Sequence, residues 1–193
     1  LQGFIKTYLI DYFEENFFRR SFDEVIREYR HVMDNALGAD SYSITKIEKL
    51  HQLGYLPIEI WALPEGTRVP MHVPMFGITN TKEEFAWLPQ SLESLISAEM
   101  WHPMLAATVG VTYREIVNKY YEETCEDDIL RAKALGSFDF RGEECLESAV
   151  KAAAGWCLSF LNTATVPVIP YLEENYNCNC ETEPVAFGSP STE

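Results

Sequence analysis

The sequence has few basic residues and no long hydrophobic run. Lys and Arg number 15 against 30 Asp and Glu, which gives the 193-residue chain a formal net charge of −15 at pH 7. Such an acidic surface repels nucleic acid and anionic lipid, so we expect neither as a partner. No apolar run approaches the roughly 20 residues that span a bilayer, and we expect no membrane segment. A small phosphorylated substrate stays compatible, because a few local cations suffice to bind it.

The spacing of the cysteines and histidines predicts neither a set of disulfides nor a metal site. The five cysteines are odd in number and their spacing predicts no set of disulfides, and no signal peptide is evident, so we expect a cytoplasmic protein. Cys178 and Cys180 form a C-x-C pair, but a zinc site needs a second pair or nearby histidines. The four histidines are distant in sequence. We therefore expect no metal site and interpret the pair as a polar loop that carries two thiols.

Hydrophobic periodicity predicts a mixed α/β chain that begins with helices. The predicted helices in the first two thirds cover residues 4–18, 22–37, 44–53, 83–98 and 104–124. Ser21 and Glu24 form a capping-box pattern before the second of these helices, and Gly38 and Gly54 follow two helix ends. A break is expected at Trp101–Pro103, between the last two helices.

Strands are predicted in two places. Residues 57–64 alternate as a strand does, and residues 69–78 hold short strands that prolines interrupt. In the last third, strands at 133–138 and 165–168 alternate with helices at 143–161 and 168–176. This order is typical of a parallel α/β unit, but two such strands are too few to close a barrel.

The segment Leu135–Gly142 is the strongest candidate for a binding site. An apolar lead-in and a Gly/Ser turn present Phe138 and Arg141 at the predicted end of a strand, and a helix follows. An aromatic face can stack on a flat heteroaromatic ring, while a guanidinium binds a phosphate. The alternative is structural, because a Phe at a strand end is usually part of the core and an Arg is usually a surface charge.

The remaining polar residues are better interpreted as structural than as catalytic or ligand-binding. The acidic run from Glu126 to Asp128 follows a helix end and is best interpreted as a solvated turn. His102 is a lone histidine, which favours a structural or surface role over that of a catalytic base. His72 is expected on the exposed side of a strand. The sequence contains no G-x-x-x-x-G-K-[ST] phosphate loop, and its spacing indicates no Ser/His/Asp or Cys/His constellation.

An ordered string of motifs resembles the type II phosphoribosyltransferases, the family that acts on nicotinamide and nicotinate. The resemblance extends from near Leu1 to Glu193. The motifs are Leu56–Ile60, Leu63–Thr67, Val73–Pro74, Asn80–Thr81, Phe85–Leu88, Glu93–Ile96, Trp101–Pro103, Ala107–Thr108, Phe138–Gly142 and Ser159–Val166.

The resemblance implies both a fold and a reaction. Residues 1–103 would form part of a helical and β-rich domain with antiparallel strands, and residues 104–193 the first βα units of an incomplete α/β barrel. The implied reaction transfers a 5-phosphoribosyl group from phosphoribosyl pyrophosphate to a pyridine nitrogen in NAD salvage. It releases pyrophosphate with the help of Mg²⁺, in a homodimer, and ATP coupling through a phosphorylated histidine is possible in the family. Phe138 would stack on the pyridine ring, and Arg141 would lie near the ring and the phosphoribosyl group.

The sequence also departs from the family pattern. Ala164 stands where nicotinamide-specific members carry an Asp that accepts a hydrogen bond from the carboxamide, which leaves nicotinate as an alternative substrate. Gly136 and Ser137 replace a typical His-Asp pair, which leaves a non-catalytic binding relative as another alternative. The catalytic histidine of the family would fall just beyond Glu193, so we assign no catalytic residue within the chain. We expect a fragment or a shortened relative that is inactive alone.

Overall fold

The computed structural model describes residues 1–186, and the end of the chain near Glu193 lies outside the described residues. The chain divides into two compact units. The first holds residues 1, 3–63 and 71–94, and the second holds residue 2, residues 64–70 and the chain from residue 95 onward. The architecture is mixed α/β and mostly helical. The division at residue 103 that the resemblance implies stays a prediction.

The first unit begins with a helical segment of unusual geometry. The short α1 (Gln2–Phe4) leads into two π-helical stretches, η1 (Ile5–Tyr12) and η2 (Glu14–Phe18). The predicted helix over residues 4–18 is therefore present, but its hydrogen bonds are mostly of the wider i→i+5 type rather than α-helical. This geometry could not be predicted, because the spacing of the aromatic residues suits either kind of helix.

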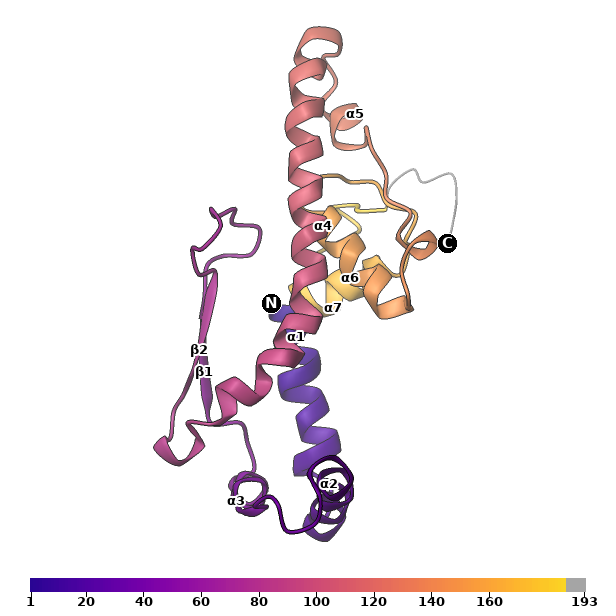
Figure 1. Cartoon of the computed structure of the whole chain (residues 1–193). Helices are drawn as coiled ribbons and strands as arrows, with labels where there is room; N and C mark the ends of the chain where they lie inside the picture. Colours follow the sequence, from indigo (N-terminus) through magenta and orange to yellow (C-terminus); the bar gives the residue numbers. More distant parts are fainter. Residues whose placement is uncertain (187–193) are drawn as a thin grey trace. The chain divides into compact units, whose positions relative to one another are not determined.

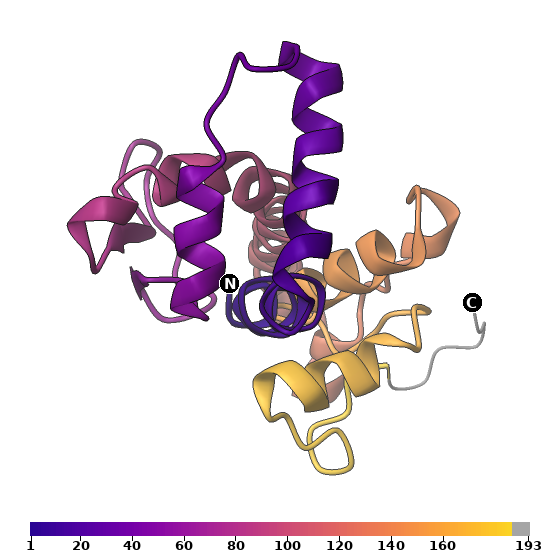
Figure 2. The ribbon, with the colours of Figure 1, turned by 90° about the horizontal axis from the view of Figure 1, so that it is seen from below.

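Two α-helices follow, with the ends that their sequences predict. The hydroxyl of Ser21 caps α2 (Phe22–Leu37) and accepts from the backbone N–H of Glu24 at 3.4 Å. Gly38 ends α2 with a φ of 91°, and Gly54 ends α3 (Thr45–Leu53) in the left-handed conformation. The two helices contact one another, and both are visible in Figure 2.

The sheet of the first unit is a two-stranded antiparallel ribbon. Strands β1 (Ile58–Ala62) and β2 (Phe76–Asn80) pair with Ile60 opposite Ile78 and Trp61 opposite Gly77 (Figure 1). The Trp61 indole occupies the space that a Cβ atom at position 77 would take, so a larger residue there would force the indole to move. The short strands predicted within residues 69–78 are confirmed only at 76–78, which belong to β2. Residues 69–75 form no strand, and His72 there has a φ of 70°. His72 is exposed as expected, but it does not lie on a strand.

A single long helix, α4 (Leu88–Thr124), follows the short 3₁₀ turn η3 (Glu83–Phe85). The predicted break at Trp101–Pro103 is wrong, because the helix continues through Pro103. A proline inside a helix costs the hydrogen bond to the carbonyl four residues earlier, here that of Glu99. Helix α6 (Leu146–Trp156) lies close to α4 around the proline. Lys151 pairs with Glu99, and Gly155 lies near the carbonyl of Pro103 and the backbone nitrogen of Ala107.

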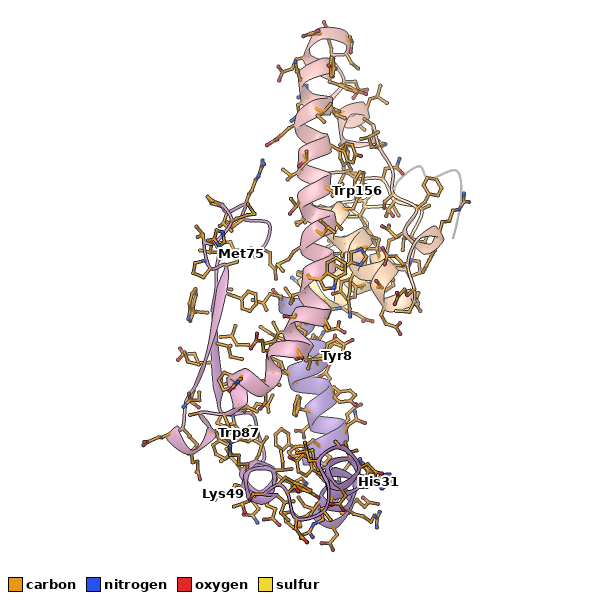
Figure 3. The ribbon with its side chains drawn as sticks, viewed as in Figure 1. Tyr8, His31, Lys49, Met75, Trp87 and Trp156 are labelled. Atoms are coloured by element: carbon orange, nitrogen blue, oxygen red, sulfur yellow. The ribbon has the colours of Figure 1, made fainter. Side chains whose placement is uncertain are left out.

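The rest of the second unit contains short helices; α7 (Val168–Tyr176) lies beside α6 and contacts it, while α5 (Asp128–Ala132) lies near the C-terminal end of α4 (Figure 1). Asp127 caps α5, and the acidic run from Glu126 to Asp128 is exposed as predicted. Trp156, labelled in Figure 3, stacks on Phe160 with ring centroids 4.8 Å apart. Buried residues of the α6–α7 core are Ala153, Val168, Leu172 and Val185.

The two strands predicted in the last third are absent from the described residues. A single parallel bridge between Ser137 and Thr163 stands in their place. The bridge is isolated, and the sheet formed by the described residues contains β1 and β2 alone. The barrel that the resemblance implies therefore stays a prediction. Across residues 1–186, no helix has the length and apolar character needed to cross a bilayer.

Candidate functional site

Phe138 and Arg141 lie together on one tight turn. The turn is the 3₁₀ segment η4 (Asp139–Arg141), which directly follows the bridged residue Ser137. The guanidinium carbon of Arg141 lies 5.1 Å from the centroid of the Phe138 ring, in a cation–π contact. Both residues are exposed, with 43% of Phe138 accessible. The structure thus brings together an accessible aromatic ring and a cation, as the sequence predicted, although after a bridge rather than a strand.

Backbone hydrogen bonds hold the turn. The N–H of Arg141 donates to the carbonyl of Phe138 at 3.2 Å, and the N–H groups of Gly142 and Glu143 both donate to the carbonyl of Asp139 at 3.1 Å. Three successive donors are therefore satisfied within six residues. The relative placement of the Phe138 ring and the Arg141 side chain is consequently set by a compact, hydrogen-bonded unit.

Asp139 anchors the turn to the segment that contains Ala164. Its Oδ2 lies within hydrogen-bond distance of three hydroxyls, those of Ser137 at 2.6 Å, Thr165 at 3.0 Å and Thr163 at 3.4 Å. Both threonines are fully buried. A carboxylate that accepts from several hydroxyls is strongly stabilised in place. Sequence reasoning missed this cluster, for which the only signal was the T-x-T pattern around Ala164.

Ala164 lies beside the turn but is not accessible. Only 2% of its surface is exposed, and its backbone N–H donates to the carbonyl of Ser137 at 2.8 Å. The structure therefore brings all three predicted site residues, Phe138, Arg141 and Ala164, into one constellation. Its accessible part is formed by Phe138 and Arg141, while Ala164 belongs to the buried support. Their roles toward a ligand stay predictions.

A second polar cluster adjoins the turn and was also missed from the sequence. His102 on α4 contacts Glu143 (Nε2 to Oε1, 3.1 Å) and Ser148 on α6 (Nδ1 to Oγ, 3.2 Å). The hydroxyl of Ser148 donates to Oε2 of Glu143 at 2.7 Å, which closes a ring of three side chains. Because this hydroxyl proton goes to the carboxylate rather than to the imidazole, the cluster does not have the arrangement of a Ser-His-acid nucleophile. Spacing could not have indicated it, since 41 residues separate His102 from Glu143.

Two thiols of the second unit, those of Cys157 and Cys180, have raised pKa values. Burial, with a smaller contribution from the charge of Asp139, raises the pKa of the Cys157 thiol to about 12. Burial also raises the pKa of Cys180. Within residues 1–186, no group of three or more His, Cys, Asp and Glu side chains is placed to hold a metal ion.

The first unit contains an apolar groove of about 500 Å³. Its lining includes Ile5, Leu9 and Glu14 of the π-helical segment and Tyr55 and Ile60 near β1. None of the predicted site residues lines it.

Comparison with known proteins gives the class of protein that the chain resembles. No established family profile matches the chain. Its sequence is nevertheless similar to curated phosphoribosyltransferases, the class that the ordered motifs predicted.

These relatives carry the name nicotinamide phosphoribosyltransferase. The protein from Acinetobacter baylyi is 37% identical over 179 residues, which is 91% of this chain and 35% of the relative. The protein from Xanthomonas campestris pv. campestris is 33% identical over 125 residues, 64% of this chain and 26% of the relative. The protein from Mycoplasma genitalium is 25% identical over 101 residues, 51% of this chain and 22% of the relative. The chain therefore spans about a third or less of the length of the curated relatives it matches.

Proposed function

We propose that the chain forms the N-terminal to central part of a nicotinamide phosphoribosyltransferase of NAD salvage. The complete protein would transfer the 5-phosphoribosyl group of phosphoribosyl pyrophosphate to nicotinamide, giving nicotinamide mononucleotide and pyrophosphate. The observation that carries this proposal is the 37% identity over 91% of the chain, in a region that holds Phe138 and Arg141 side by side. A cytoplasmic location and a homodimer stay part of the same proposal.

In this proposal the turn supplies one wall of the base site. The exposed face of Phe138 would stack on the pyridine ring and keep its nitrogen aimed at the ribosyl carbon. The guanidinium of Arg141 would place fixed positive charge beside the phosphoribosyl group. Such charge stabilises a displacement in which negative charge collects on the leaving pyrophosphate. Asp139 would contribute indirectly, since its bonds to Ser137 and Thr165 hold the turn that carries both groups.

Mg²⁺ binding and ATP coupling are two further features of the proposed reaction to which no described residue is assigned. Mg²⁺ would be held largely by the pyrophosphate oxygens, since the described residues offer no cluster suited to bind it. ATP coupling would need the histidine that the resemblance places beyond Glu193, and it stays an expectation.

Ala164 favours a second candidate function. A buried methyl group cannot accept a hydrogen bond from a carboxamide, and the absence of an acid also removes a repulsion against nicotinate. Nicotinate phosphoribosyl transfer is therefore the main alternative. A relative that binds the mononucleotide without turnover is the other.

Alanine substitutions in the full-length protein test the site. Phe138→Ala and Arg141→Ala should each raise the KM for nicotinamide or for phosphoribosyl pyrophosphate by about five- to thirtyfold. Tyr120→Ala and Arg27→Ala are matched controls, because they remove an exposed aromatic residue and an exposed arginine elsewhere. Unchanged kinetics in both site variants would show that the turn does not bind substrate.

A further inference from the structure

The cluster of His102, Glu143 and Ser148 connects three separate elements of the second unit. His102 lies on α4, Ser148 lies in the first turn of α6, and Glu143 lies in the loop between η4 and α6. The cluster is largely shielded from solvent, with the side chains of His102 and Glu143 25% and 17% exposed. Shielding from solvent strengthens such contacts relative to those on an open surface.

This cluster is the second of two anchors on the turn that carries Phe138 and Arg141. The first anchor is Asp139, which binds the turn to Thr165. Glu143 lies two residues after Arg141, and its N–H donates to the carbonyl of Asp139, so it belongs to the same hydrogen-bonded unit. Its carboxylate then binds that unit to α4 and α6. The turn is thus fixed at both ends, and Arg141 lies between the two fixed points.

The number of protons in the cluster decides whether all three contacts form. A charged imidazole has two N–H donors, which match Oε1 of Glu143 and Oγ of Ser148, and the Ser148 hydroxyl donates to Oε2 of Glu143. A neutral imidazole has one donor. If the single ring proton is on Nδ1, the unprotonated Nε2 faces the carboxylate of Glu143. If it is on Nε2, the unprotonated Nδ1 and Glu143 compete for the single hydroxyl proton of Ser148. At least one of the three contacts is lost.

We propose that His102 and Glu143 are positioning residues for Arg141, and that the charged form of His102 completes the clamp that holds the turn in its binding geometry. The effect on substrate rests on the proposed function, whereas the clamp itself rests on the contacts alone. Histidine side chains in general change their charge between about pH 5 and 8. The clamp is complete only when the His102 imidazole carries both ring protons.

Other charged groups near the cluster are already paired. On α4, Glu99 lies one turn before His102, and on α6 Lys151 lies one turn after Ser148. These two form an ion pair with each other. Glu147, also on α6, has a pKa lowered chiefly by a backbone hydrogen bond at its own position, so it stays ionised through the same pH range. The second N–H donor that completes the clamp can therefore come only from the His102 ring.

The clamp can be tested without any assay of activity. NMR spectra of the labelled chain should show the backbone amide signals of Arg141 and Gly142 shifting with the same midpoint as the His102 ring signals. Glu143→Gln should abolish this shared midpoint, while the matched neighbour Glu144→Gln should preserve it, because Glu144 is exposed. The proposal would be overturned if the amide signals of Arg141 and Gly142 did not change together with the His102 ring signals. It would also be overturned if the two variants behaved alike.

Kinetics of the full-length protein then separate positioning from simple stability. The KM for nicotinamide should rise about two- to tenfold between pH 6 and 8 in the unmodified protein, with little change in kcat. His102→Asn should lose this pH dependence, whereas the control His31→Asn, on the exposed surface of α2, should keep it. If the ratio of the KM at pH 8 to the KM at pH 6 were the same in His102→Asn as in the unmodified protein, the positioning role would be contradicted. A protein that forms no mononucleotide at all contradicts the proposed function instead, and the amide titration still decides the clamp.

Discussion

Gly155 on α6 lies directly against the backbone carbonyl of Pro103 on α4. A Cβ atom at position 155 would overlap that carbonyl oxygen and lie 3.1 Å from the backbone nitrogen of Ala107. Both obstacles are backbone atoms of one helix, so neither can move aside as a side chain could. The close approach of α4 and α6, and with it the position of the His102 contacts, therefore depends on the absence of a side chain at residue 155.

Gly155→Ala should consequently destabilise the protein. Overpacking of this kind costs about 1–3 kcal/mol, which outweighs the gain of at most about 1 kcal/mol from replacing glycine inside a helix. Urea denaturation would measure the change. Gly142→Ala is the control, because nothing lies within 4 Å of a Cβ atom there, and its free energy of unfolding should change by less than about 0.5 kcal/mol. A neutral Gly155→Ala would show that the helices can separate at little cost.

Removing the carboxylate of Asp139 should loosen the turn. Asp139→Ala leaves the hydroxyls of Thr163 and Thr165 without their shared acceptor in a buried place, at a cost of about 1–3 kcal/mol. Asp139→Asn should cost less, since an amide oxygen can still accept. Asp11→Ala, an exposed carboxylate in the π-helical segment, is the matched control. Thermal denaturation of the three variants provides the comparison, and equal melting temperatures would argue against the anchoring role.

The stability of the chain should fall at alkaline pH. The pKa of Cys157 is raised to about 12 in the folded protein from an ordinary value of 9.0, so the folded state keeps a proton that the unfolded state releases. The free energy of unfolding should therefore decrease as the pH rises from about 9 to 12. Burial raises the pKa of Tyr171 as well, which adds to the same slope at higher pH.

Cys157→Ala should make that alkaline slope shallower, and chemical denaturation at pH 8, 9 and 10 would show it. Below pH 9 the thiol should resist iodoacetamide in the folded chain, while the exposed Cys145 reacts. Alkylation of Cys157 at the rate of Cys145 in the folded protein would show that the thiol is neither buried nor shifted.

Replacing Ala164 by Asp tests whether the site has room for an acid at that position. The new carboxylate would be buried between Thr163 and Thr165, close to the charge of Asp139, so we expect a loss of about 2 kcal/mol or more. Adding Asp139→Asn should restore part of that loss, because the repulsion is removed. Urea denaturation of the single and double variants measures the coupling, and additive effects would show that the two positions do not interact.

Much of the first unit could be predicted because its signals are local. The Ser21 cap, the glycines after α2 and α3 and the alternation of β1 each act within a few residues. The wrong predictions have non-local causes. Pro103 was expected to end a helix, but α4 continues through it, and Gly155 of the distant segment α6 lies against its carbonyl. The strands of the last third were inferred from apolar runs, and pairing partners decide whether such runs form a ladder.

The site was predictable only in its exposed part. An aromatic residue and an arginine three positions apart after a Gly/Ser turn are visible in the sequence, and the structure does place Phe138 beside Arg141. The anchors were not visible, because Asp139 and Thr165 are 26 residues apart and His102 and Glu143 are 41 residues apart. Ordinary polar residues carry no signal of a shared cluster until the fold brings them together.

Identifying the product of the full-length protein tests the proposed phosphoribosyl transfer. The protein would be incubated with phosphoribosyl pyrophosphate, Mg²⁺ and either nicotinamide or nicotinate, with and without ATP, and the mononucleotide would be measured by mass spectrometry. We expect nicotinamide mononucleotide, formed faster than the nicotinate product. Failure to form either mononucleotide, while the protein still binds nicotinamide mononucleotide, would contradict the account and favour a non-catalytic relative.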